Sequence, residues 1–187
     1  MSTQEELRII ALAEFAAAGY GATSLQRIAE RAGVSKSSVL YHFSSKEHLL
    51  DAAIGPAIDR MHIVLEPLEG RGGLGDRQAF LEAFVDFLLE YRLEVNMFIN
   101  QGPSLIDVPV IERANDLVRQ LAAFFAVNTG SLEEKMRFGI ALGGAAYMLC
   151  SAQTFDLAQT ESIDETRAAL ISILSDLLNP ASATTLG

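Results

Sequence analysis

The stretch SLQRIAERAGVSKSSVLYHFSSKEHLL, residues 24–50, has the pattern of short helices separated by tight turns. Apolar residues recur at helical spacing over residues 25–32, and Gly33 then supplies a residue that tolerates the left-handed backbone of a turn. Ser35 is placed to cap a second helix that runs to about Phe43. A helix, a tight turn and a second helix whose first turn is small, polar and basic are typical of a helix-turn-helix.

Capping signals frame this stretch on both sides. Serine or threonine followed three residues later by glutamate or glutamine favours a helix start, because each side chain satisfies a backbone amide of the other residue. Thr23 and Ser44 each begin such a capping box. Apolar spacing predicts a further helix over residues 4–18, which Gly19 ends. We therefore predict a compact helical domain of residues 1–48.

The chain beyond this domain also has helical periodicity, and its sequence shows no alternating strand pattern of useful length. Ser131 and Ser162 each begin a further capping box. The sequence therefore predicts an all-α protein with a second helical domain over residues 49–180 and a disordered tail of residues 181–187. The later helices are expected at residues 77–100, 108–127, 132–157 and 163–178.

Charge is distributed unevenly along the chain. The 187 residues carry a formal net charge of -10, yet residues 1–50 hold five basic and five acidic side chains. The whole excess of negative charge therefore follows residue 50. Because salt screens charges over roughly 8 to 10 Å, the acidic part repels a polyanion bound at the other end only weakly. The acidic composition thus does not exclude nucleic acid as a partner of the N-terminal domain.

Residues 138–155 are 18 consecutive uncharged residues, which is near the lower limit for a membrane-spanning helix. The stretch is rich in glycine and alanine, so its insertion into a membrane is only weakly driven. We interpret it instead as a helix buried on most of its circumference. Its glycines, Gly139, Gly143 and Gly144, would let another helix approach closely.

The sequence shows neither a catalytic constellation nor a metal-ligand cluster. The three histidines, His42, His48 and His62, form no ligand pattern with cysteine. The single cysteine, Cys150, cannot form an internal disulfide, and we expect it to be a small apolar residue rather than a nucleophile. The first ten residues carry charges where a signal peptide is apolar. We therefore predict a cytoplasmic protein that is not an enzyme and has no cofactor.

The expected helix-turn-helix offers hydrogen-bond donors to DNA. The first turn of its second helix is placed to face base edges or phosphates, and aromatic donors one turn later are placed to face backbone oxygens. The starts of the flanking helices favour phosphate, because their amides are unpaired and the helix dipole is positive there. Each residue also has a structural alternative, such as capping for a serine or packing for a tyrosine. The candidate DNA-binding residues are Thr23, Ser24, Ser35, Lys36, Ser37, Ser38, Tyr41, His42 and Lys46, with Arg27 as a further cation.

Residues 8–50 carry a longer pattern than a helix-turn-helix alone. The pattern combines the phenylalanine and glycine of the first helix with T-S-x-x-x-I-A-x-x-A-G-V-S, followed by Y-H-F and S-K-E-x-L. At these spacings the segment resembles the N-terminal DNA-binding domain of the tetracycline-repressor (TetR) family of transcriptional regulators. It departs from the family at Ser37-Ser38, where Gly-Thr is frequent, and at Leu40-Tyr41, where two tyrosines are frequent.

The resemblance implies a homodimer that binds a palindromic operator near a promoter, usually as a repressor. It implies release from DNA when a small molecule occupies the C-terminal domain, which would then be a regulatory and dimerisation domain. By the same similarity Thr23 and Lys46 contact phosphate. An alternative is a helical small-molecule-binding protein that no longer binds DNA. The implied dimer forms through the two C-terminal helices, of which the last has an apolar stripe of Leu170, Ile173, Leu174 and Leu177.

Aromatic side chains are frequent in residues 80–125 and suit a ligand pocket between helices. Aromatic residues on helices also form plain core, so each of them has that alternative. The candidate ligand-binding residues are Phe84, Phe87, Tyr91, Phe98 and Phe124, with Arg92, Asn96, Asn100 and Gln101 as polar candidates beside them.

Overall fold

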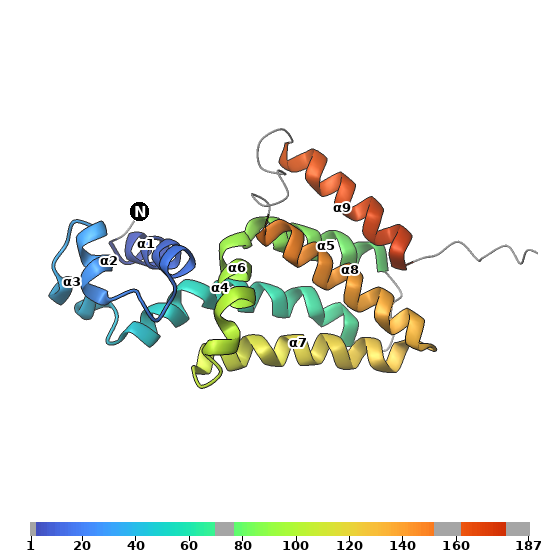
Figure 1. Cartoon of the computed structure of the whole chain (residues 1–187), viewed down its shortest axis with the longest axis horizontal. Coiled ribbons are helices and arrows are strands. Elements are labelled where there is room, and N and C mark those ends of the chain that lie inside the picture. Colours follow the sequence, from blue (N-terminus) through green and yellow to red (C-terminus); the bar gives the residue numbers. More distant parts are fainter. Residues whose placement is uncertain (1–2, 70–76, 152–161, 179–187) are drawn as a thin grey trace, which may run out of the picture. The chain divides into compact units, whose positions relative to one another are not determined.

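The computed structural model describes residues 3–69, 77–151 and 162–178, and each element in these ranges is a helix (Figure 1). The predicted all-α fold class is therefore confirmed. The expected tail of residues 181–187 lies outside the described residues, as do residues 152–157 of one expected helix. The helices are α1 (Thr3–Ala18), α2 (Leu25–Arg31), α3 (Lys36–His42), α4 (Lys46–Glu69), α5 (Arg77–Glu90), α6 (Arg92–Gln101), α7 (Pro109–Asn128), α8 (Leu132–Cys150) and α9 (Ile163–Leu178), with a 3-10 turn at Gly102–Ser104.

The chain divides into two compact units. Unit 1 consists of residues 1–60 and 93–117, and unit 2 consists of residues 61–92 and 118–187. Unit 1 thus contains the helix-turn-helix, the first part of α4, nearly all of α6 and the first half of α7. It is larger than the predicted domain of residues 1–48, whose boundary remains a prediction.

Unit 1 is held together by one hydrophobic core. Phe15 of α1 and Phe43 after α3 are fully buried in it. Met97 of α6 and Ile111 of α7 are fully buried in the same core, so these helices pack with the helix-turn-helix. Burying one such side chain stabilises the folded state by about 1.5 to 3 kcal/mol. Two later helices are therefore structural parts of this unit.

Two of the predicted capping boxes are formed. The Ser131 hydroxyl accepts the Glu134 amide at 3.1 Å, and the Glu134 carboxylate accepts the Ser131 amide. At the start of α9, Ser162 and Glu165 make the same pair of reciprocal bonds, at 2.8 Å and 3.2 Å. The backbone amide and hydroxyl of Ser162 lower the pKa of the Glu165 carboxyl. Both helix starts were therefore predicted correctly.

At the other two helix starts, the predicted capping residue is wrong by one position. α2 is capped by Ser24, whose hydroxyl accepts the Arg27 amide at 3.1 Å, because the Thr23 side chain turns into the interior instead. At the start of α4, Ser45 rather than Ser44 accepts the His48 amide, at 3.0 Å. In both places two hydroxyl residues are adjacent, and the helix uses the second of them.

The single helix predicted over residues 77–100 is two helices. α5 ends at Glu90, the Tyr91 amide donates to the Phe87 carbonyl in a turn, and α6 begins at Arg92. The break places α5 in unit 2 and residues 93–101 of α6 in unit 1. The aromatic residues that share one periodic pattern in the sequence are therefore divided between the two units.

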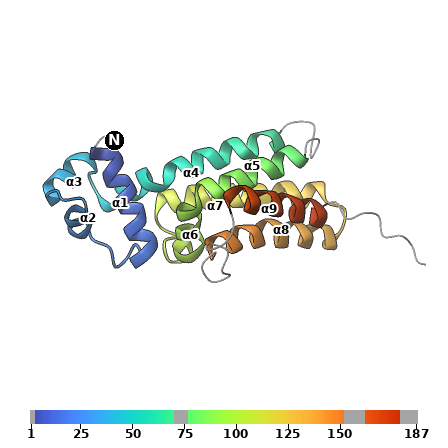
Figure 2. The same cartoon turned by 90° about the horizontal axis from the view of Figure 1, so that it is seen from above.

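Unit 2 is a helical bundle in which α5, α8 and α9 pack pairwise (Figure 2). Leu81 and Val85 of α5 and Leu174 of α9 are buried in it. The Arg167 guanidinium of α9 bonds both carboxylate oxygens of Asp86, one of them at 3.0 Å. Arg77 donates to the Leu178 carbonyl at 2.6 Å, which satisfies an otherwise unpaired group at the end of α9.

α8 is buried on one face only, so the expectation of burial around most of its circumference is wrong for this chain by itself. Phe138, Leu142 and Leu149 face the interior, whereas Ile140 and Tyr147 are exposed. Among the described residues, no atom outside the neighbouring residues and backbone of α8 itself lies within 4 Å of a Cβ built on the glycines of this helix, Gly139, Gly143 and Gly144. Within those residues, no helix is long and apolar enough to span a bilayer.

Candidate nucleic-acid interface

α3 follows a tight turn and packs on unit 1 through one fully buried side chain. Gly33 has a φ of +67°, a left-handed conformation that glycine adopts without a steric cost. The Val34 amide then donates to the Ala29 carbonyl at 3.0 Å, which fixes the exit from α2. In the seven-residue α3, only Val39 is fully buried. The opposite side of α3 is consequently open to solvent.

The polar residues predicted on α3 lie mainly on this open side. Lys36 and Ser37 are exposed, and Tyr41 is 86% exposed. The Ser35 hydroxyl accepts the Ser38 amide at 3.1 Å and lies 2.8 Å from the Ser37 hydroxyl. Ser35 therefore caps the helix, as predicted, while Lys36 and Tyr41 keep their polar ends in solvent.

His42 and Leu40 lie on either side of Tyr41. The His42 ring is half-buried and lies 5.2 Å from the Tyr41 ring and 6.5 Å from the Phe43 ring. Leu40, which departs from the expected tyrosine, is 42% exposed. The exposed surface at the end of α3 is thus an aromatic and apolar edge with one imidazole.

Lys46 begins α4 and is held by an aromatic ring. Its ammonium nitrogen lies 4.1 Å from the centroid of the Tyr20 ring, within the range of a cation–π contact. Partial burial lowers the pKa of this ammonium from its usual value. Burial also raises the pKa of the Tyr20 hydroxyl, with a smaller effect from Glu47. The cation at the start of α4 is therefore placed by a specific contact.

Thr23 is not available to DNA in this structure. It is 2% exposed, and its hydroxyl donates toward the Gly19 carbonyl at 2.9 Å and the Glu14 carbonyl at 3.2 Å. Its amide is also bonded, to the Gly19 and Tyr20 carbonyls. In this structure both donors serve the turn after α1, which is a structural role, and the phosphate contact of Thr23 stays a prediction. Ser24 is exposed beside it and caps α2.

Glu14 was missed by sequence reasoning. This residue of α1 is 4% exposed, and its carboxylate bonds Arg27 and, at 2.9 Å, Arg31 of α2. Arg27 was expected to attract phosphate, but in this structure it bonds the Glu14 carboxylate, which it shares with Arg31. Glu14 follows Leu7 and Ala11 on the buried face of α1, so an acidic residue within an apolar stripe was the available signal.

The candidate ligand-binding residues are divided between the two units. In unit 2, Phe84 and Phe87 are buried core residues, and Phe124 lies 5.3 Å from Phe125, ring centroid to ring centroid. Tyr91 stacks on Phe87 at 5.4 Å. Phe98 packs on the core of unit 1 instead. Whether any of these residues binds a ligand stays a prediction.

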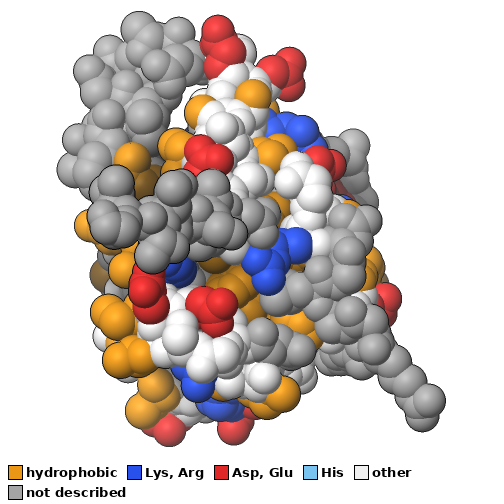
Figure 3. Space-filling view, turned by 90° about the vertical axis from the view of Figure 1, so that its right-hand side faces the viewer, with side chains coloured by type: hydrophobic (Ala, Val, Ile, Leu, Met, Phe, Trp, Pro, Cys, Tyr) orange, Lys and Arg blue, Asp and Glu red, His pale blue; other side chains and the backbone are white. Residues whose placement is uncertain are grey.

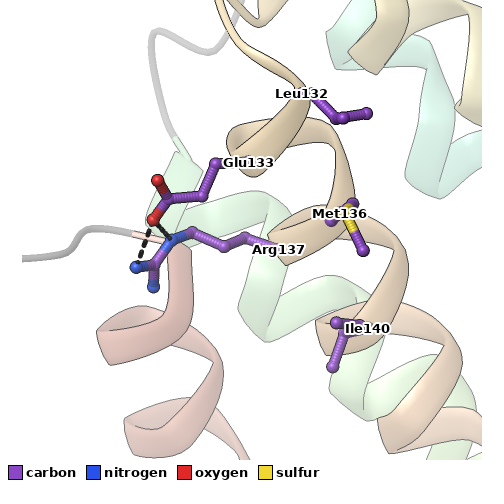
Figure 4. Close-up of a pocket in the computed structure, with 5 residues that line it drawn as sticks. All are labelled: Leu132, Glu133, Met136, Arg137 and Ile140. Carbon is purple, nitrogen blue, oxygen red and sulfur yellow. Dashed lines mark hydrogen bonds and ion pairs between the residues drawn. The ribbon is translucent and has the colours of Figure 1, made fainter.

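A hollow of unit 2 lies on α8 and involves none of the predicted ligand residues. It is lined by Leu132, Met136 and Ile140, with an ion pair of Glu133 and Arg137 beside them (Figure 4). The three apolar side chains lie on successive turns of one helix and are exposed by 57 to 74%. Such a shallow apolar surface fits a flat partner better than an enclosed small molecule.

The described residues contain no group of three histidine, cysteine or acidic side chains placed to hold a metal ion. Cys150, at the end of α8, is half-buried, and burial raises the pKa of its thiol to about 11 although Arg92 lowers it in part. A thiol with this pKa stays protonated at neutral pH and is a poor nucleophile.

The sequence that forms the helix-turn-helix is similar to that of known proteins. Residues 10–53 match the sequence pattern described as bacterial regulatory proteins, tetR family. The HTH-type transcriptional regulator RutR of Escherichia coli is 35% identical over 116 residues, which are 59% of this chain and 49% of RutR. The chain thus spans about half the length of this curated relative. The matched segment contains the whole helix-turn-helix and the start of α4.

Solved structures extend the likeness to nearly the whole chain. A TetR-family regulator from Streptomyces coelicolor has a TM-score of 0.71 at 21% identity, covering 97% of this chain and 93% of that one. A TetR/AcrR-family regulator from Thermobifida fusca has a TM-score of 0.58 at 26% identity, covering 95% and 97%. The fold is therefore shared along the chain, beyond the matched N-terminal segment. The helix-turn-helix of this chain thus matches the tetR family of bacterial regulatory proteins, and the fold of the chain is similar to that of solved regulators of this family.

Proposed function

We propose that the protein is a transcriptional regulator that binds double-stranded DNA through α3 and the start of α4. The observation that carries this proposal is the open side of α3, where Lys36 and Tyr41 extend into solvent from a helix anchored by Val39. A major groove admits such a helix, with side chains of its first turns toward base edges. Lys46 is the candidate for a phosphate of the flanking backbone.

The charge of unit 1 supports binding at this face in particular. Arg27 and Arg31 both bond Glu14, and α2 also carries Glu30, so the two cations are balanced by two carboxylates and this part of unit 1 has little net charge. Lys36 on α3 and Lys46 on α4 are then the prominent cations of the proposed interface. Placed donors, rather than a basic surface, would bring the DNA to α3.

We propose a homodimer formed through α8 and α9. Leu132, Met136, Ile140 and Tyr147 are exposed at helical spacing on α8, beside the open glycines described above. Ile173 of α9 is also 54% exposed, whereas Leu174 is buried within the chain. Figure 3 shows hydrophobic side chains reaching the surface of unit 2 among charged ones. A second copy would cover this apolar surface, because like faces pair in a two-fold dimer.

Such a dimer would read a palindromic operator. Two copies of α3 related by two-fold symmetry fit half-sites one helical turn apart, about 34 Å of DNA. The usual outcome in this family is repression, and we propose that role in the cytoplasm, where the chromosome lies. Release by a small molecule would require that ligand to favour the non-binding state by about 5.5 kcal/mol to move the population from 1:99 to 99:1.

Selection of bound sequences from random DNA tests the proposal. The wild type is expected to enrich a palindrome, with an affinity that falls as salt rises, since phosphate contacts release counterions. Replacing Lys36 and Tyr41 together with alanine should weaken specific binding by at least about tenfold. Arg119→Ala, at an exposed arginine of α7 outside the proposed DNA and dimer contacts, is the matched control and should bind normally.

The alternative is a helical small-molecule-binding protein that has lost DNA binding. It predicts that wild type and the Lys36→Ala, Tyr41→Ala variant bind every DNA equally weakly. If no sequence is bound better than random DNA, the regulator proposal is wrong. Sedimentation of the free protein at micromolar concentration tests the dimer separately, and Ile140→Glu on α8 should shift it toward monomer.

A further inference from the structure

Gln101, the last residue of α6, bonds the end of α1. Its side-chain oxygen accepts the Tyr20 amide at 2.6 Å, and its side-chain nitrogen donates to the Phe15 carbonyl at 2.7 Å. The two bonds span 81 and 86 residues of sequence, and all three residues belong to unit 1. One amide side chain thus supplies both an acceptor and a donor to a helix terminus.

The end of α1 has backbone groups that can bond this side-chain amide. The Phe15 carbonyl accepts the Gly19 amide at 3.0 Å and has a second lone pair, which the Gln101 side chain fills, while α1 has no basic residue in its last turn to serve its carbonyls. Gly19 follows with a φ of +89°, which turns the chain so that the next amide, that of Tyr20, faces Gln101. A Cβ on Gly19 would lie 3.7 Å from the Gln101 side-chain oxygen. Gln101 therefore fixes the conformation of the turn after α1.

The same turn holds the lysine at the start of α4. The Tyr20 ring packs on the fully buried Phe15 ring, with 5.2 Å between centroids. The Lys46 ammonium lies 4.1 Å from the centroid of the Tyr20 ring. A continuous series of contacts thus runs from the Gln101 amide through Tyr20 to the ammonium of Lys46.

We propose that Gln101 is a positioning residue for DNA binding: through Tyr20 it fixes the Lys46 ammonium where that group meets a DNA phosphate. The proposal rests on the proposed function, since it assigns Lys46 a phosphate. A lysine side chain that is already ordered loses less conformational entropy when it binds. If the Gln101 bonds are lost, the Tyr20 ring is released and Lys46 has to be ordered by the DNA itself.

Variants at Gln101 and Tyr20 separate the steps of this series. Gln101→Met has a similar length and makes neither bond, whereas Gln101→Glu keeps the acceptor for Tyr20 and loses the donor to Phe15. Tyr20→Leu removes the ring, and Tyr20→Phe keeps it as the matched control. We expect Gln101→Met and Tyr20→Leu to weaken operator binding by about 2- to 30-fold, the range of a cation–π contact. Tyr20→Phe should bind like wild type.

A double-mutant cycle with Lys46→Met gives the decisive measurement. Lys46→Met itself should reduce the slope of log affinity against log salt by about 1.8, because each of the two bound subunits loses one phosphate contact worth about 0.9. In that background Gln101→Met and Tyr20→Leu should cause no further loss, because the group that they position is absent. Urea unfolding of each variant corrects the affinities for any loss of folded protein.

The outcomes distinguish this inference from the proposed function. If Gln101→Met weakens binding equally with and without Lys46, Gln101 acts through the fold alone and the inference is overturned. If wild type binds an operator but Lys46→Met leaves the salt slope unchanged, the inference is also overturned while DNA binding stands. If wild type prefers no sequence at all, the proposed function fails, and the inference fails with it.

Discussion

α2 and α3 are both seven-residue helices with basic side chains, yet their charges are used in opposite ways. Arg27 and Arg31 of α2 bond the buried carboxylate of Glu14 and so bind α2 to α1. Lys36 of α3 remains in solvent, as does Tyr41 of the same helix. One helix is therefore bound to the protein by its cations, while the other is free to offer its cation to a partner. Counting charges along the sequence does not separate these two uses.

The difference arises from one buried carboxylate. A carboxylate out of contact with water is costly unless it is paired and hydrogen-bonded. The Glu14 side chain is 6% exposed, whereas those of Arg27 and Arg31 are 52% and 69% exposed. Removing the arginines would leave a buried charge unpaired, while removing Glu14 would leave two solvated cations. The two sides of this ion pair should consequently differ in their effect on stability.

The largest effect is expected when both arginines are replaced. Arg27→Met with Arg31→Met should lower the free energy of unfolding by about 3 kcal/mol, because the Glu14 carboxylate stays buried without a partner. Urea denaturation followed by circular dichroism measures this change. Adding Glu14→Leu to the same variant should recover most of the loss, because no buried charge remains. A loss of the same size in the triple variant would contradict this account of α2.

A smaller effect is expected at Thr23. Thr23→Val removes a buried hydroxyl that donates toward the Glu14 and Gly19 carbonyls, and it should cost about 1 to 2 kcal/mol of stability. The slope of DNA affinity against salt should not change, because the buried hydroxyl is not in contact with phosphate. Thr23→Ser, which keeps the hydroxyl, is the control. A shallower salt slope for Thr23→Val would restore the phosphate contact predicted from the sequence.

The caps of α2 and α3 allow a direct comparison. Ser24→Ala and Ser35→Ala each remove a hydroxyl that accepts a backbone amide at 3.1 Å, and each should cost about 1 kcal/mol. Their effects on DNA binding should differ, since only Ser35 begins the helix that we propose faces the groove. We expect Ser35→Ala to weaken operator binding more than Ser24→Ala at equal stability. If the two variants lose the same amount of operator affinity in a gel-shift titration, the caps of α2 and α3 contribute equally to DNA binding.

Features set by neighbours in the sequence were predictable. The turn at Gly33, the cap at Ser35 and the capping box at Ser131 each depend on residues within four positions, and the structure forms all three. The choice between adjacent hydroxyl residues was not predictable, because Thr23 turns inward to meet carbonyls of the turn after α1. Local spacing gives both residues of such a pair the same signal.

Features that join distant parts of the chain were not predictable. Gln101 was a candidate for a ligand pocket, but its partners are Phe15 and Tyr20, more than eighty residues earlier. No glycine or proline marks the break at Tyr91, so the apolar periodicity of the sequence predicted a single helix where the structure has α5 and α6. The turn and the cap of the helix-turn-helix were therefore better predicted than the long-range contacts that hold unit 1 together.

The smallest effect is expected at Arg113. This cation bonds two acidic side chains at the surface, whereas the buried Glu14 carboxylate bonds two arginines. The Arg113 guanidinium bonds Asp51 at 3.0 Å and Asp59 at 3.1 Å, and the three side chains are 48%, 49% and 73% exposed. Exposed ion pairs contribute about 0.2 to 1 kcal/mol, so Arg113→Met should lower the unfolding free energy by no more than about 1 kcal/mol. In about 1 M salt, where screening acts within about 3 Å, this loss should nearly vanish. The loss for Arg27→Met with Arg31→Met should persist there, because its source is the burial of Glu14 rather than attraction across water. Urea unfolding at low and high salt measures both losses of unfolding free energy. If the two losses depend on salt in the same way, the burial of Glu14 does not explain the difference between the two ion-pair sites.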